Sequence, residues 1–130
     1  MTAKSFDLAA TFAVLGPGGS AIPVDVTPTI YADLNRRFEG FADHCLVSCH
    51  TFDTDWSSWE MHPAGDEVVC LLSGEAKMAL DMGGKEEIVH LRKAGDYVIV
   101  PKGTWHTGRT TGAATMLFIT PGADTQHRPV

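Results

Sequence analysis

The feature that most constrains this chain is a series of short apolar segments, separated by glycine and proline turn signals about every ten residues. We expect strands over residues 44–52, 56–62, 67–72, 76–82, 88–91, 97–100, 105–110 and 115–120. Residues 76–82 alternate apolar with other side chains, and residues 68–72 are continuously apolar, as in a strand covered on both faces. Since strands and helices do not alternate, an all-β sandwich or barrel is favoured over a doubly wound parallel sheet.

The length and charge limit the classes of protein that the chain can belong to. Its 130 residues provide for one domain with one core. Ten Lys and Arg against 16 Asp and Glu give a net charge of -6, which disfavours nucleic-acid binding. No apolar run approaches the roughly 20 residues of a membrane span, and no secretory signal is visible, so we expect a cytoplasmic protein without membrane partners.

The three cysteines fit a reducing compartment, because an odd number without a signal peptide argues against a disulfide framework. Cys45 and Cys49 are four residues apart and would share one face of a strand. They could form a zinc thiolate pair, but such pairs usually have shorter spacing and a second pair elsewhere. The favoured interpretation is that Cys45, Cys49 and Cys70 are small buried apolar residues.

We divide the chain into an N-terminal arm over residues 1–40, a barrel over 41–122 and a polar tail over 123–130. Residues 16–19 (Gly-Pro-Gly-Gly) predict a turn in the arm, and residues 30–38 fit either a short helix or an edge strand. The arm is expected to pack on the barrel or on the partner subunit of a dimer.

Two motifs bring together residues suited to bind a metal. Glu60 and His62 are two apart on a strand and share a face, and a turn through residues 63–65 can bring Glu67 opposite them. The second motif is Gly95, Pro101, Gly103 and His106, and closure of a barrel can bring its histidine across the mouth. The two motifs therefore predict four side chains at one point.

With these spacings, and with six residues between Glu67 and Gly74, the sequence resembles the cupin superfamily, in particular its small single-domain cupin-2 proteins. The resemblance implies a double-stranded β-helix, the jelly-roll barrel. It also implies that His62, Glu67 and His106 bind a divalent metal in the barrel mouth. Three positions depart from the family pattern: Thr54 and Thr110 replace flanking residues, and Glu60 replaces the first motif histidine.

The replacement at position 60 touches the chemistry directly. By position, Glu60 is either a fourth ligand, a catalytic general base or a bystander. Two imidazoles and two carboxylates around a divalent ion sum to about zero charge, which favours hard ions over copper and leaves Zn, Fe, Mn or Ni as candidates. Without a cation, Glu60 and Glu67 would repel each other and one of their pKa values should rise.

Two functions remain open. The chain is either a metal-dependent enzyme of the dioxygenase, isomerase or decarboxylase type acting on a small organic acid, sugar or aromatic, or a non-catalytic ligand-binding cupin that has lost its metal. In the second case Met78, Leu80, Met82 and the tryptophans would line the pocket. The expected partners are a small-molecule ligand and, from the family resemblance, a second copy in a homodimer. His44, His50, His90 and His127 match no motif and are treated as surface or structural residues.

Overall fold

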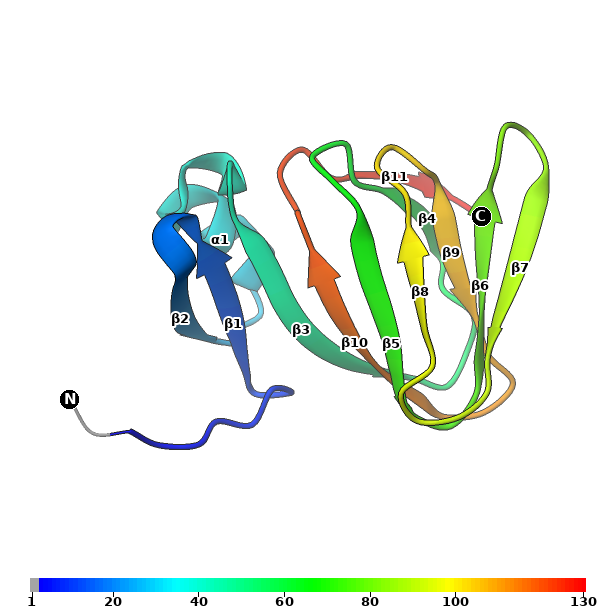
Figure 1. Cartoon of the computed structure of the whole chain (residues 1–130), viewed down its shortest axis with the longest axis horizontal. Coiled ribbons are helices and arrows are strands. Elements are labelled where there is room, and N and C mark those ends of the chain that lie inside the picture. Colours follow the sequence, from blue (N-terminus) through cyan, green and yellow to red (C-terminus); the bar gives the residue numbers. More distant parts are fainter. Residues whose placement is uncertain (1–2) are drawn as a thin grey trace.

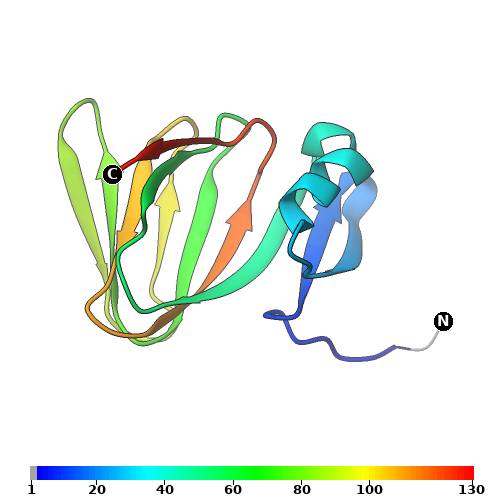
Figure 2. The same cartoon turned by 180° about the vertical axis from the view of Figure 1, so that it is seen from behind.

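Two antiparallel sheets face each other in the computed structural model, which describes residues 3–130 (Figures 1 and 2). The six-stranded sheet contains, in spatial order, β2 (Ser20–Asp25), β1 (Thr11–Gly16), β3 (Cys45–Phe52), β10 (Ala114–Thr120), β5 (Glu67–Ser73) and β8 (Tyr97–Val100). The five-stranded sheet contains β11 (Gln126–Pro129), β4 (Ser58–Met61), β9 (His106–Arg109), β6 (Ala76–Asp81) and β7 (Glu86–Leu91). All eight strands expected after residue 43 are present, and the all-β prediction is confirmed.

The core of the barrel lies between the inner faces of the two sheets. Inward residues alternate along each strand, so that in β5 Val69 and Leu71 are fully buried while Leu72 is exposed. Met78 and Leu80 of β6 belong to this core instead of lining a pocket, and Met82 is exposed. The expectation that these three side chains line the pocket was therefore wrong: β6 is central in its sheet, where inward side chains fill the interior.

Residues 1–40, expected to be a less regular arm, contain regular structure that joins the barrel. β1 and β2 form a hairpin around the predicted Gly-Pro-Gly-Gly turn, with 3-10 helix η1 (Pro17–Gly19) at its tip, and β1 extends the large sheet by pairing with β3. Pro23 breaks the apolar pattern of β2, but it lies in an edge strand where a missing N–H is tolerated.

Residues 30–38 resolve into helix α1 (Ile30–Arg37), followed by the 3-10 helix η2 (Glu39–Phe41). Asp33 in the first turn accepts a hydrogen bond from the Thr29 hydroxyl, and two arginines end the helix, an arrangement that suits the helix dipole. Ile30 and Leu34 bury the inner face of α1 in a second apolar cluster with β1 and β3. No helix within the described residues is long and apolar enough to cross a membrane.

The C-terminal residues, expected to be a polar tail, contain the edge strand β11, which pairs with β4. Its pattern escaped detection because all four residues of β11 are exposed and polar or proline. Arg128 lies over the rings of Trp59 and Trp105, and its guanidinium also faces Asp81. Packing of its charged side chain over two indoles therefore helps to hold the strand on the barrel.

Candidate metal centre

Strands of the two facing sheets place the predicted site residues together. Glu60 on β4 is directly opposite His106 on β9, and cross-strand partners project to the same face of a sheet. His62 lies just beyond the end of β4, and Glu67 opens β5 after the turn, which is the arrangement that the two motifs predict. The four candidate side chains thus come from both sheets.

The side-chain nitrogen and oxygen atoms of these four residues lie close to one another. Glu67 places Oε1 at 3.1 Å from Nε2 of His106 and Oε2 at 3.3 Å from Nε2 of His62. Glu60 is more distant, with Oε2 at 3.9 Å from Nε2 of His62, yet ligand atoms of Glu60, His62 and His106 all lie within 4.8 Å of one another. His106, Glu67 and His62 are 0, 3 and 5% exposed, whereas the Glu60 side chain is 31% exposed.

Hydrogen bonds to the far side of each ring fix the protonation of both imidazoles. Nδ1 of His106 lies 3.1 Å from the carbonyl oxygen of Thr104, which can only accept a hydrogen bond. Nδ1 of His62 lies 2.8 Å from the Thr125 hydroxyl, whose own hydrogen is donated to the carbonyl of Gly122. Both Nδ1 atoms therefore carry hydrogen, so Nε2 is the atom of each ring that faces the site, and in the neutral ring it holds the free lone pair.

The atoms that face the centre have no hydrogen-bond partner among the described residues. They are Nε2 of His62, Nε2 of His106 and Oε1 of Glu67, all inaccessible to solvent. Buried polar atoms without partners are rare, because each costs about 1–3 kcal/mol. Two imidazole nitrogens and a carboxylate oxygen are ligands that first-row divalent metals accept, so the donor set fits a metal ion.

The same cluster controls the pKa values of its members. Burial alone would raise the pKa of the Glu67 carboxyl, but His106 and His62 outweigh burial and lower that pKa to about 2. Burial likewise opposes the charged form of His106, but Glu67 overrides it and raises the pKa of the imidazole. The pKa of Glu67 is therefore lowered, so the rise expected at one of the two carboxyl groups does not occur at Glu67, where the two imidazoles dominate.

A cavity of about 930 Å³ opens onto the site. Phe52, Trp56 and Phe118 form an aromatic wall along it, with Trp56 packed edge-on to the His106 ring at 6.3 Å between centroids. Of the three tryptophans only Trp56 lines this cavity, since Trp59 and Trp105 pack on Arg128 instead. The walls can exclude water from a bound molecule.

Three residues at the site were missed by the motif analysis. Thr120 donates a hydrogen bond to Oε2 of Glu67, Thr125 orients His62, and His127 places Nε2 at 3.4 Å from Oε1 of Glu60. His127 is the direct partner of Glu60 across the β11–β4 pair. A single threonine or histidine near the C-terminus carries no spacing signal, so only the folded structure reveals these roles, and for His127 it is the pairing of β11 with β4.

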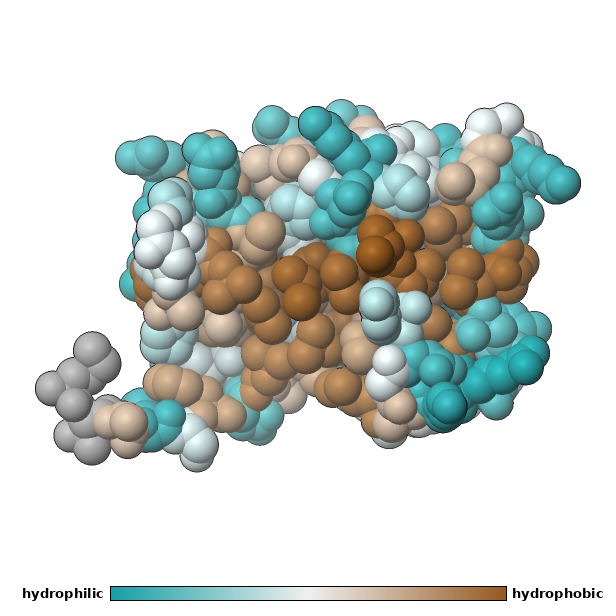
Figure 3. Space-filling model, viewed as in Figure 1, coloured by the Kyte–Doolittle hydropathy of each residue, from teal (hydrophilic) through white to brown (hydrophobic). Residues whose placement is uncertain are grey.

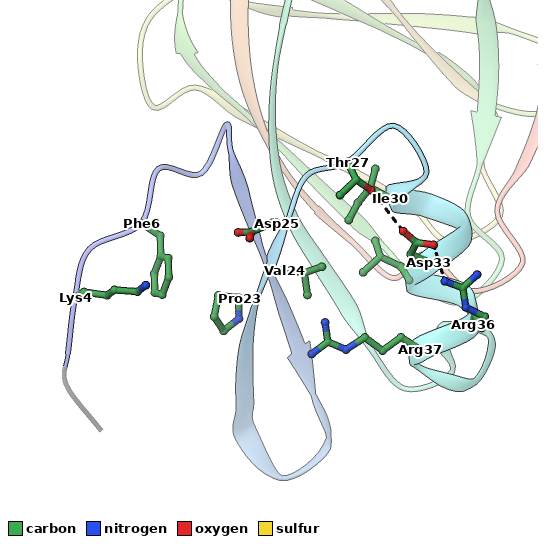
Figure 4. Close-up of a pocket in the computed structure, with 11 residues that line it drawn as sticks. Lys4, Phe6, Pro23, Val24, Asp25, Thr27, Ile30, Asp33, Arg36 and Arg37 are labelled. Atoms are coloured by element: carbon green, nitrogen blue, oxygen red, sulfur yellow. Dashed lines mark hydrogen bonds and ion pairs between the residues drawn. The ribbon is translucent and has the colours of Figure 1, made fainter.

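A second hollow, of about 600 Å³, lies between the N-terminal segment and α1 (Figure 4). Its charged groups already have partners: Asp33 forms an ion pair with Arg36 at 2.7 Å, and Lys4 lies over the ring of Phe6. Arg37 lies over the ring of Phe38. This hollow thus lacks the convergent, unpartnered polar atoms of the first cavity.

Comparison with known families identifies the segment that carries the candidate site. Residues 53–120 match the family described as the cupin domain (Cupin_2), a segment that contains both motifs and all four candidate ligands. This chain belongs to the cupin superfamily. The cupin core thus spans β4 to β10, whereas β1, β2, α1, β3 and β11 lie outside the matched segment.

Three relatives illustrate the similarity. The uncharacterised protein YdbB of Bacillus subtilis (strain 168) is 38% identical over 69 residues, which is 52% of this cupin and about half, 55%, of that protein. A cupin-2 domain protein from Shewanella frigidimarina superposes with a TM-score of 0.51 at 21% identity, covering 59% of this chain and 70% of that one. Hydroquinone 1,2-dioxygenase from Sphingomonas sp. TTNP3 gives 0.51 at 18% identity, covering 58% of each chain. The two solved structures establish a shared fold.

Proposed function

We propose that this cupin is a metal-dependent enzyme for a small molecule, with a divalent ion held by His62, Glu67 and His106. The observation that carries the proposal is the set of unpartnered atoms at the centre, two of them Nε2 atoms of imidazole rings that carry a proton on Nδ1. Glu60 supplies the fourth ligand or a general base. Zn, Fe, Mn and Ni all accept this mixture of nitrogen and oxygen.

When bound, the ion would act as a Lewis acid on a carbonyl or hydroxyl group of an organic acid, sugar or aromatic compound. Glu67, held by Thr120, neutralises charge at the buried end of the site. Glu60 reaches the cavity with its two oxygens directed toward His62 and His127, so it can take a proton from a bound molecule. The aromatic wall of Phe52, Trp56 and Phe118 keeps the reacting group away from water.

The reaction class lies among those that cupin barrels support. Structures with the same fold include the dioxygenase above, with 4-hydroxybenzoate bound, and a Bacillus subtilis oxalate decarboxylase with Mn(II) centres. The decarboxylase superposes with a TM-score of 0.53 at 18% identity, covering 66% of this chain and 24% of that one. We therefore place the function among dioxygenase, isomerase and decarboxylase chemistries.

Elemental analysis of protein purified without chelator tests the proposal. We expect about one first-row metal per chain, and a higher melting temperature on metal addition, because a ligand that binds the native state stabilises it. His106→Ala should abolish both effects, whereas His90→Ala, at an exposed pair with Glu75 outside the cavity, should change neither. A protein that stays metal-free but binds small molecules regardless of chelator would instead be the non-catalytic ligand-binding cupin.

We also propose that two copies associate through the outer face of the six-stranded sheet. The outward residues of β3, β5, β8 and β10 include no charged side chain, and Figure 3 shows the resulting apolar band. Leu72, Tyr97 and Ile99 are its exposed large members. Contiguous apolar patches of this kind mark interfaces, and a two-fold dimer would pair the face with itself. A monomeric mass in light scattering would refute this assembly.

A further inference from the structure

The cavity has a second polar cluster, supplied by segments outside the matched cupin segment. Helix α1 buries Ile30 and Leu34 in the apolar cluster, while Tyr31 and Asn35 line the cavity. Tyr31 and Asn35 are four residues apart, so they share one face of the helix. The helix thus packs through one pair of residues and presents a phenol and an amide to the cavity through the other.

Strand β3 completes the cluster from the barrel side. Ser48 and His50 are two apart on β3, point inward and line the same cavity. Nε2 of His50 lies 3.1 Å from the Tyr31 hydroxyl, which joins the helix to the strand by a hydrogen bond. A tyrosine hydroxyl can both donate and accept, so this bond leaves it able to bind a further group.

The position of Tyr31 is not explained by packing. Its side chain is 55% exposed, yet its hydroxyl is held at the cavity. Burial lowers the pKa of His50, and aromatic contacts with Phe12, Phe52 and Phe118 hold the ring in place, so a neutral imidazole backs the phenol. Between this cluster and the metal centre the cavity wall is aromatic, formed by Phe52, Trp56 and Phe118.

We propose that Tyr31, Asn35, Ser48 and His50 form a second binding subsite, and that the ligand is a bifunctional molecule with an apolar, ring-containing middle. One polar end, a carboxylate or a similar chelating group, meets the metal centre. The other end, a hydroxyl or carbonyl group, bonds to Tyr31 and its neighbours. This inference rests on the proposed function for the first end only. Because the subsite lies outside residues 53–120, it distinguishes this chain from the common cupin core.

Matched probe pairs test the subsite in the metal-loaded protein. The probes are 4-hydroxybenzoate, 4-hydroxyphenylacetate and 3-(4-hydroxyphenyl)propionate, each compared by calorimetry with the same acid lacking the hydroxyl. The added methylene groups vary the reach of the hydroxyl. We expect at least one pair to show a preference of about fivefold for the hydroxylated acid, the typical effect of one hydrogen bond.

Tyr31→Phe or Asn35→Ala should reduce that preference to less than about twofold, leaving the affinity for the acid without hydroxyl unchanged. Tyr97→Phe is the matched control, because this tyrosine lies on β8, on the proposed dimer face and outside the cavity, and the variant should keep the wild-type preference. Equal affinities within every pair, or a preference that survives in both variants, would overturn the subsite. Metal content is measured on the same samples. Protein that binds metal but shows no preference for the hydroxylated acid would refute the subsite alone. Protein that binds no metal would refute the proposed function.

Discussion

Thr125→Val is the most direct test of how the site is organised. Valine matches threonine in shape, but it cannot accept the hydrogen bond that Nδ1 of His62 makes at 2.8 Å. The backbone bond from the N–H of residue 125 to the carbonyl of Gly122 remains, so the turn should keep its course. The variant therefore removes one hydroxyl and leaves the four candidate ligands in the chain.

The size of the effect follows from the burial of His62. A buried Nδ1–H without an acceptor costs about 1–3 kcal/mol. The ring can escape that cost by moving its proton to Nε2 or by turning, and either change withdraws the lone pair from the metal centre. Loss of such an outer partner typically lowers metal affinity by about 10–100-fold, and we expect a loss in that range.

Competition between the protein and a chromophoric chelator for Zn²⁺ measures this affinity, and urea unfolding of the metal-free protein reports stability separately. Thr125→Ser is the control, since it keeps the hydroxyl and should bind the metal within about twofold of wild type. Unchanged affinity in Thr125→Val would refute the tautomer argument, and equal losses in both variants would assign the effect to altered packing at position 125 instead of to the hydroxyl.

Three further outcomes are expected. Glu60→Gln should weaken metal binding by no more than about fivefold, as for a part-exposed ion pair. Glu67→Gln should lower the metal affinity by more than about a hundredfold, because its carboxylate is buried. Similar losses of affinity in the two variants, measured in the same chelator assay, would contradict this ranking. In metal-free protein, the lowered pKa of Glu67 contributes stability that is present above pH 4.5 and lost as the pH falls towards 2, equivalent to about 3 kcal/mol. The raised pKa of His106 contributes stability that is present below pH 6.5 and lost as the pH rises through that pKa. The free energy of unfolding in urea should therefore fall both at acidic pH and at higher pH. A profile that does not change with pH would show that Glu67 and His106 do not form an ion pair. Finally, Gly74→Ala should destabilise the fold by about 2 kcal/mol or more, because its Cβ would lie 2.1 Å from the Ala113 carbonyl oxygen. Gly84→Ala, also at positive φ but with open space around the Cβ, should destabilise the fold clearly less. Equal melting temperatures of the two variants would exclude the steric contact as the cause.

The strands of the barrel could be predicted because their information is local. Buried faces are indicated by the alternation in residues 76–82 and by the continuous apolar run in residues 68–72. Glycine pairs indicate the turns. The metal-centre candidates could be predicted for a related reason: residues 60 and 62 share a face, and the barrel itself brings positions 67 and 106 to them. Spacing and family pattern were sufficient for both.

The remaining features depend on contacts between segments far apart in the chain. Strand β11 has no apolar face, so the sequence shows no pattern that predicts its pairing with β4, the pairing that brings His127 to the site. The turn that carries Thr125 shows no such pattern either. The choice of helix for residues 30–38, and with it the presence of Tyr31 in the cavity, was fixed by the packing of Ile30 and Leu34 against β1 and β3. Local periodicity specifies which face of a segment is buried, but it does not specify the distant partner that its polar atoms meet. The candidate ligands of this cupin can therefore be predicted from the sequence, whereas the groups that orient them, and the second polar cluster of the cavity, emerge only when the segments are packed together.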